Sequence, residues 1–169
     1  KTDYIGDFKP GNHDLTFEPA LGNLGTPNNF AIQNDGKLIL VGNFNKFENT
    51  DFTSKNVVRL LENGFVDESF VLNAEPNSEI NSIAIQQDGK ILVGGSFTNF
   101  GGKSRIARLL SDGKIDETFN PGESVNGAIS VIKVQQDGKI LIGGSFSTLN
   151  GNTVGALTRL NADGTADET

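Results

Sequence analysis

The chain of 169 residues contains no cysteine, no methionine and no tryptophan, and it has a single histidine. Without cysteine it can form no disulfide framework, no thiolate metal site and no cysteine nucleophile. No apolar run approaches the roughly 20 residues that a membrane-spanning helix needs. Because even the first residue is not methionine, we expect a chain that was processed or that belongs to a longer one.

Positive charge is also scarce. The formal net charge is −7, and lysine and arginine form no cluster. A surface for nucleic acid or for an anionic membrane needs such a cluster, so neither partner is predicted. Glycine, in contrast, fills 21 positions, and asparagine is almost as frequent. Both tolerate a positive φ, so the composition favours short strands joined by many tight turns.

Three segments repeat one pattern: Gln-x-Asp-Gly-Lys, an apolar run ending in glycine and phenylalanine, then Arg-Leu, then Gly-x-x-Asp-x-Ser/Thr. The repeated positions are the hairpin aspartates Asp35, Asp88 and Asp137, the arginines Arg59, Arg108 and Arg159, and the later aspartates Asp67, Asp116 and Asp167. Successive hairpin aspartates are 53 and 49 residues apart, and only the stretch before the arginine changes length. Such a loop is expected to be exposed and is the natural place for function.

One unit predicts four short strands. Residues 80–86 alternate as a half-buried strand does, and the Asp-Gly that follows predicts a tight hairpin. Residues 90–93 form a short apolar run, typical of a strand buried on both faces. The third and fourth strands are expected at 106–110 and 115–119. Gly95, which ends the second strand, predicts a left-handed backbone and a bulge or bend.

Four antiparallel strands in about 50 residues match one blade of a β-propeller. We therefore predict an all-β fold, a propeller fragment with about three repeats, because a closed propeller uses about 4–8 blades. A β-solenoid is the alternative, but its coils are far shorter than this period. Phe17 is expected at the first blade interface. The predicted parts of this one domain are a partial N-terminal blade (1–26), two complete blades (27–76 and 77–126) and a truncated third (127–169).

The composite motif running from Ala84 to Phe97, then Arg108-Leu109, then Gly113-x-x-Asp-x-Thr-Phe119, resembles the delta-60 repeat family. The resemblance covers about residues 27–169. That family is predicted to form β-propellers and occurs in large bacterial surface and secreted proteins, many from Bacteroidetes. In that phylum such proteins look like cargo of the type IX secretion system, and some belong with gliding adhesins. The resemblance implies an extracellular or outer-membrane-associated location more firmly than it implies a ligand.

Paired carboxylates recur once per unit, at Asp67-Glu68 and its two counterparts. They could be an acid/base pair or calcium ligands, but the Asp-x-Asp-x-Asp-Gly spacing that wraps a cation is absent. The favoured interpretation is structural: the aspartate caps a turn or pairs with the repeated arginine. The arginines could instead line a channel and clamp an anion. His13 has no ligand cluster around it, and no serine has a partnering base. We therefore predict no enzyme activity, no cofactor and no metal site.

The predicted binding face carries the length-variable loops 47–55, 100–104 and 149–154. In a four-stranded blade, this loop lies on the same face as the connection between blades. The loops are rich in Asn, Thr, Ser and Gly, which suit a polar ligand. The alternative is that they merely tolerate insertion, with Phe52 folded back onto Phe47. The candidate binding residues are Glu48, Asp51, Phe52, Lys103, Asn150 and Asn152.

Three function classes follow. The first is a non-enzymatic cell-surface or secreted module of an adhesin or gliding-related protein exported by the type IX system. The second is a carbohydrate-binding propeller attached to a secreted enzyme. The third, a hydrolase or lyase propeller, is disfavoured because no histidine/acid cluster is present. The expected partners are other parts of a longer chain, outer-membrane secretion or surface machinery, glycans or a surface protein. Since each unit buries its strands against neighbours, an isolated three-unit chain is predicted to be marginally stable or oligomeric.

Overall fold

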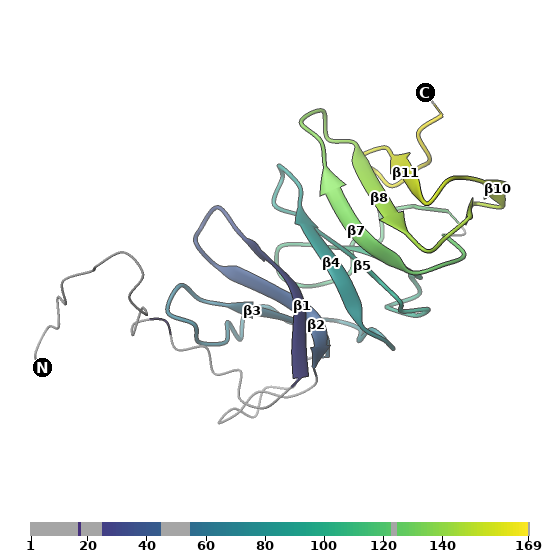
Figure 1. Cartoon of the computed structure of the whole chain (residues 1–169). Coiled ribbons are helices and arrows are strands. Elements are labelled where there is room, and N and C mark those ends of the chain that lie inside the picture. The colour runs from purple at the N-terminus through teal and green to yellow at the C-terminus, as the bar shows by residue number, and fades with distance from the viewer. Residues whose placement is uncertain (1–16, 18–24, 45–54, 123–124, 169) are drawn as a thin grey trace, which may run out of the picture.

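The computed structural model describes residues 17, 25–44, 55–122 and 125–168. Within these residues the chain forms strands and turns and no helix, so the all-β prediction is confirmed. Nine of the eleven described strands form three antiparallel sheets that succeed one another along the chain, and the other two form a small hairpin sheet (Figure 1). The first contains β1 (Gly25–Ile32), β2 (Leu38–Phe44) and β3 (Val57–Leu60). The second contains β4 (Ile80–Ile85), β5 (Ile91–Gly95) and β6 (Ile106–Leu109), and the third contains β7 (Ile129–Val134), β8 (Ile140–Gly144) and β11 (Leu157–Leu160).

Each sheet is a meander whose central strand comes second in the sequence. In the second sheet, the central residues Ile91, Leu92 and Val93 are all fully buried. This is the pattern that a continuous apolar run predicts for a strand packed on both faces. The predicted fourth strand is reduced to a single bridge, Leu109 to Ile115 in this sheet. It ends there because the next residue, Asp116, accepts the N–H of Thr118 and so turns the chain out of the ladder.

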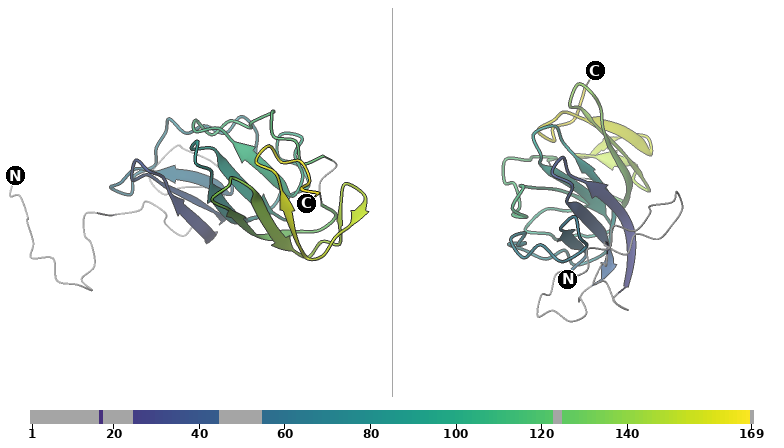
Figure 2. Two further views of the ribbon diagram at one scale, coloured as in Figure 1. Left: turned by 90° about the horizontal axis from the view of Figure 1, so that it is seen from above. Right: turned by 90° about the vertical axis from the view of Figure 1, so that its left-hand side faces the viewer.

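The three sheets lie side by side, in the order in which they occur in the sequence (Figures 1 and 2). Their first strands are in contact, β1 with β4 and β4 with β7. Each first strand has an irregular register within its first four residues, and in two of them the unpaired residue reaches the next sheet. Asn28 Nδ2 donates to the carbonyl of Ile80 (3.0 Å), and Asn81 Nδ2 donates to that of Ile129 (3.2 Å). These bulges therefore join neighbouring blades at their inner strands.

The hydrophobic core lies between the sheets. One buried cluster joins the first and second sheets, with Ile39, Val41, Val57 and Phe70 on one side and Ile80, Ile83, Ile91 and Val93 on the other. A second cluster joins the second and third sheets, with Leu92, Ile106 and Phe119 facing Ile129, Ile132, Ile140 and Ile142. Phe17 packs against a third cluster on the other side of the first sheet, as expected of a phenylalanine that takes the place of Phe70 one period earlier.

The prediction of a left-handed backbone at Gly95 is wrong. Its φ lies outside the left-handed region, and the bulge sits on the partner strand at Asn81. Gly95 is required for a different reason: a Cβ there would lie 2.3 Å from the carbonyl oxygen of Glu79. Gly42 on β2 and Gly144 at the end of β8 lie under the same close backbone approach. Among the described residues, no helix is long and apolar enough to cross a membrane.

Candidate functional site

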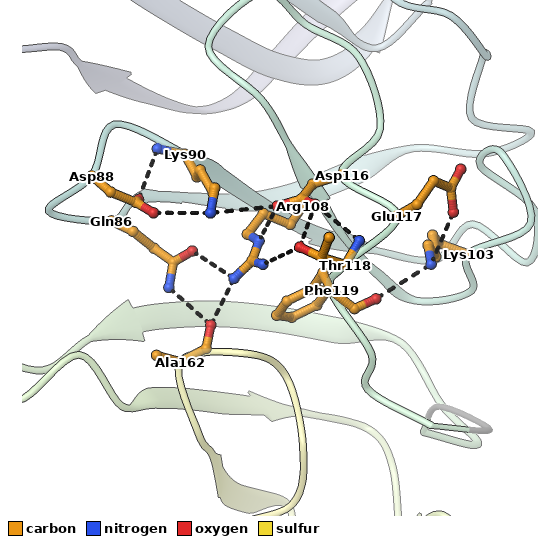
Figure 3. A network of polar contacts seen from close by, with 10 residues as sticks. All are labelled: Gln86, Asp88, Lys90, Lys103, Arg108, Asp116, Glu117, Thr118, Phe119 and Ala162. Atoms are coloured by element: carbon orange, nitrogen blue, oxygen red, sulfur yellow. Dashed lines mark hydrogen bonds and ion pairs between the residues drawn. The ribbon is translucent and has the colours of Figure 1, made fainter.

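In each unit, one aspartate forms ion pairs with an arginine and a lysine beside the third strand. In the second unit, Arg108 Nε donates to Asp116 Oδ2 at 2.9 Å, and Lys90 Nζ lies 3.7 Å from the same oxygen (Figure 3). The side chains of Arg108 and Asp116 are only 6% and 5% exposed. The first and third units repeat the arrangement with Arg59, Lys37 and Asp67, and with Arg159, Lys139 and Asp167.

The arginine also joins its blade to the next one. Arg108 Nη1 donates to the carbonyl of Ala162 at 2.7 Å, in a turn of the third unit (Figure 3). Its guanidinium carbon lies 4.8 Å from the centre of the Phe119 ring, within the range of a cation–π contact. The preceding junction repeats both contacts with Arg59, Ser111 and Phe70. The repeated arginines of the first two units are therefore bound on several sides by protein groups.

Asp67 and Asp116 are held in the ionised form. Burial alone would raise the pKa of Asp116, but hydrogen bonds from the Thr118 hydroxyl and N–H, with the charge of Arg108, outweigh it and lower the pKa. The pKa of Asp67 is also lowered, because hydrogen bonds from Ser69 and Lys37 outweigh its burial. A carboxylate that ionises so readily and is enclosed by cations is poorly suited to act as a general acid. The arrangement supports a structural role.

The hairpin aspartates act within their own turns. Asp88 Oδ1 accepts the N–H of Lys90 at 3.2 Å, and Gly89 between them has a φ of +82°. This is the turn that Asp-Gly predicts. The turns at Asp35 and Asp137 have the same bond. Together they form one edge of the three sheets, which we call the turn face (Figure 1).

The opposite edge, the loop face, carries the described length-variable loops, 100–104 and 149–154, the end of the first loop at Lys55, and the connections between blades. At the end of the first loop, Lys55 Nζ lies 3.1 Å from Glu75 Oε2 of the connection, and Asn56 Nδ2 donates to the carbonyl of Ser78 at 2.9 Å. The next connection joins the third loop through a bridge between Val125 and Leu149. Loops and connections thus share one face, as blade topology predicts.

One asparagine in each connection holds the base of the following loop. Asn126 Oδ1 accepts the N–H groups of Ser147 (2.9 Å) and Thr148 (3.1 Å), and its Nδ2 donates to Ser147 Oγ (3.1 Å). Asn77 forms the same clamp on Thr98 and Asn99. Because both loops are held at the same place, their difference in length is confined to the part beyond the clamp.

Sequence reasoning did not identify these clamps or the hairpins beyond them. β9 (Thr148–Leu149) and β10 (Asn152–Thr153) form a two-residue hairpin in which Asn150 and Gly151 both have a positive φ. The second unit has the same kind of turn, with Gly101 and Gly102 between Phe100 and Lys103. Asn-Gly and Gly-Gly are strong sequence signals for such a turn, so both hairpins could have been predicted. No comparable sequence signal marks the two clamping asparagines.

Three of the six candidate binding residues are described by the structure. Lys103 is held within its own blade: its Nζ lies 3.4 Å from Glu117 Oε2 and donates to the carbonyl of Phe119 (Figure 3). Asn150 is half-buried in its turn, whereas Asn152 on β10 is exposed. Of these three, Asn152 is therefore the most accessible. Glu48, Asp51 and Phe52 lie outside the described residues, as does His13.

A polar cleft of about 470 Å³ lies on the loop face between the first two blades. Amide and charged side chains line much of it, among them Asn43, Lys55, Asn56, Asn77 and Glu79. Such groups can exchange hydrogen bonds with hydroxyl groups or with a polar peptide. Within the described part of the chain, no group of three histidine or carboxylate side chains is placed to hold a metal ion.

Three similar sheets, packed side by side through their first strands, are what neighbouring blades of a β-propeller present. The chain also matches the model of a family described as a domain of unknown function (DUF5122) beta-propeller, at residues 33–70, 86–119 and 135–169. These matches cover more than half of the chain, so the chain belongs to this family and the propeller prediction is confirmed. No curated protein matches the chain.

Proposed function

We propose that this chain is a non-enzymatic binding module that uses its loop face to recognise a macromolecular partner. The observation that carries the proposal is that one face is constant in length from unit to unit and the other is variable. The Asp-Gly turns have one length in all units, while the opposite loops differ in length beyond a fixed clamp. A scaffold that holds the base of a loop and leaves its tip to vary is typical of recognition surfaces.

The setting we propose is a secreted or cell-surface protein, extracellular or associated with the outer membrane. This part rests on the resemblance to delta-60 repeat proteins, and it includes an adhesin or gliding-related role and export by the type IX secretion system. The net charge of −7 supports a partner other than nucleic acid. The proposed partners are a surface protein, the secretion or surface machinery, or other parts of a longer chain.

A carbohydrate-binding propeller attached to a secreted enzyme is the second candidate. The polar cleft between Asn43 and Glu79 favours it, because amide and charged side chains can bind sugar hydroxyls. A glycan array separates the two candidates. A strong hit on one class of glycan would support the second, whereas selective binding to surface proteins with no glycan hit would support the first.

The loop face is tested by two matched variants, probed against the partner or glycan that the arrays identify. The loop variant replaces Glu48, Asp51, Phe52 and Asn152 with alanine. The turn variant replaces the exposed residues Asn34, Gln87 and Gln136 on the other face with alanine. We expect the loop variant to weaken binding at least tenfold by biolayer interferometry and the turn variant to bind normally, with unchanged circular dichroism for both. The opposite pattern would show that the turn face binds.

A further inference from the structure

Arg105 has a backbone conformation that suits few residue types. It directly follows the second length-variable loop on the loop face, and its φ is +63°. Its counterpart in the first unit, Asn56, has a φ of +65°. Asparagine tolerates this left-handed region, whereas a bulky residue such as arginine is disfavoured there. Backbone strain at a residue that is not glycine indicates a task for the side chain.

The fold explains this backbone conformation but not the choice of arginine. The N–H of Arg105 donates to the carbonyl of Phe97 at 2.9 Å, and its carbonyl accepts the N–H of Gly95 at 2.9 Å. Asn56 forms the two equivalent backbone bonds in the first unit. Both blades therefore need a left-handed residue at this position, and the first blade has a residue type that suits it.

The side chain of Arg105 does not replace the contacts of Asn56. Asn56 Oδ1 accepts the N–H of Phe44 at 3.1 Å, and its Nδ2 donates to the carbonyl of Ser78 in the connection to the next blade. Arg105 has no acceptor atom, and its Nη1 donates at 2.6 Å to the carbonyl of Ser96 in its own blade. This bond fixes one side of the guanidinium group. In the described part of the chain the group makes no other hydrogen bond, so its remaining N–H groups can bind a ligand.

Arg105 also differs from most other cations in having no described carboxylate beside it. Among the described lysines and arginines, all except Arg105 and Lys133 form an ion pair with an aspartate or glutamate. At the first junction, Lys55 forms such a pair and Glu79 lines the same cleft. At the second junction, Ala128 occupies the position of Glu79. An arginine without a described acidic partner is notable in a chain whose net charge is −7.

We propose that Arg105 binds a carboxylate of a partner protein, the side chain of an aspartate or glutamate in a segment that lies on the loop face. A guanidinium group has parallel N–H donors that match the two oxygens of a carboxylate. Arg105 is half-buried and held by one bond, so its donors are already oriented before a partner binds. The negative net charge disfavours a polyanion such as an acidic glycan, and so favours an isolated carboxylate. This inference rests on the proposed use of the loop face for recognition.

The test is an NMR titration of the chain with N-acetylglutamate N-methylamide, which has one carboxylate, and with the corresponding glutamine derivative, which has none. We expect saturable shifts of the Arg105 Nε–H and Ser96 amide signals at millimolar concentrations of the first probe only. Arg105→Asn should abolish the saturable shift of the Ser96 amide. Lys133→Gln is the matched control, because Lys133 on β7 is the other described cation without an ion pair, and it should leave the titration unchanged. Absence of saturation in the parent chain, or saturation that survives Arg105→Asn, would overturn the proposal.

The same variant separates binding from folding. Asparagine suits the left-handed backbone, so Arg105→Asn should melt at the same temperature as the parent chain or at a higher one. A lower melting temperature combined with unchanged probe binding would show that Arg105 has a structural role, and would overturn the site.

Two further titrations test for other carboxylates at the site. Glu123 lies outside the described residues, and Glu123→Gln should leave the affinity for the probe unchanged. A rise of at least about tenfold would show that Glu123 competes for Arg105, and would overturn the proposal. Glucuronate that binds at Arg105 more tightly than the glutamate derivative would assign the site to an acidic glycan and overturn the protein partner.

The result also separates this inference from the proposed function. A positive titration, combined with a loop variant that binds its partner normally, would contradict the recognition role of the loop face alone. A negative titration, combined with a loop variant that loses its partner, would contradict the carboxylate site alone.

Discussion

Arg108 illustrates how one side chain serves two blades. Its Nε holds Asp116 within the second blade, its Nη1 holds the carbonyl of Ala162 in the third, and its flat face covers Phe119. A guanidinium suits these tasks because its donors point in fixed directions within one plane. A lysine at this position has a single donor group and could not make all three contacts.

Replacing Arg108 with methionine should therefore destabilise the chain strongly. Arg108→Met keeps much of the apolar stem, but it removes the closest cation from a buried carboxylate. We expect a loss of about 3 kcal/mol in the free energy of unfolding, measured by urea denaturation. Lys114→Met is the control, because the pair of Lys114 with Asp112 is exposed and contributes little. Equal losses for the two variants would contradict the proposed role.

The lowered pKa values of Asp67 and Asp116 predict acid sensitivity. A carboxyl whose pKa is lower in the folded state stabilises the fold above its unfolded pKa of about 3.9. This stabilisation is lost as the pH falls toward the folded pKa. The melting temperature should therefore decrease from about pH 5 downward, and it should decrease less in Asp116→Asn. Parallel pH profiles for the two proteins would show that Asp116 is not one of the groups responsible.

At the scale of residues, the sequence predicted partners that are close along the chain. The constant spacing of Arg59 and Asp67 indicated their pairing. The contact of Arg59 with Ser111 could not be predicted from the sequence, because the two are 52 residues apart and no pattern shows where the outer guanidinium nitrogen points. Gly95 was predicted to be special for the wrong reason. A close approach of the backbone and a positive φ both select glycine, and a single sequence does not distinguish them.

Among the elements, the length-variable loop of the third blade is held at its base by a single side chain. Asn126 makes three hydrogen bonds to the loop of the third blade. Asn126→Ala should release this loop and raise the hydrogen exchange of the Ser147 and Thr148 amides at least about tenfold, the loss of about 1.4 kcal/mol. Asn126→Asp keeps the acceptor oxygen and should largely preserve their protection. Unchanged exchange in the alanine variant would exclude the clamp.

Strands were the most predictable elements and loops the least. The repeat and the alternation of apolar residues located β4, β5 and β6 to within a few residues. The predicted fourth strand shrank to one bridge because Asp116 forms a turn at that point. The loop clamp was not predictable, because asparagine is common throughout this chain and nothing distinguishes Asn77 until the blade is folded.

For the whole molecule, stability should reside in the junctions between blades. Leu92 is fully buried and faces the third blade from the second. Leu92→Ala should lower the free energy of unfolding by about 3 kcal/mol at a fixed protein concentration. Hydrogen exchange should rise more in β7 and β8 than in β1 and β2, since the third blade loses its neighbour's support. Val71→Ala, at an exposed position, is the control and should change neither measurement. A uniform rise across all three sheets would contradict a junction-based stability.

The arginine that links two blades binds a main-chain carbonyl, that of Ser111 at one junction and that of Ala162 at the other. Every residue type offers a main-chain carbonyl, so this link imposes no side chain on the receiving unit. A unit that is duplicated, exchanged or drifting in sequence can still accept the arginine of its new neighbour. Recombination between units is therefore tolerated at this contact, and a protein engineer who lengthens the array by copying one repeat need not redesign it there.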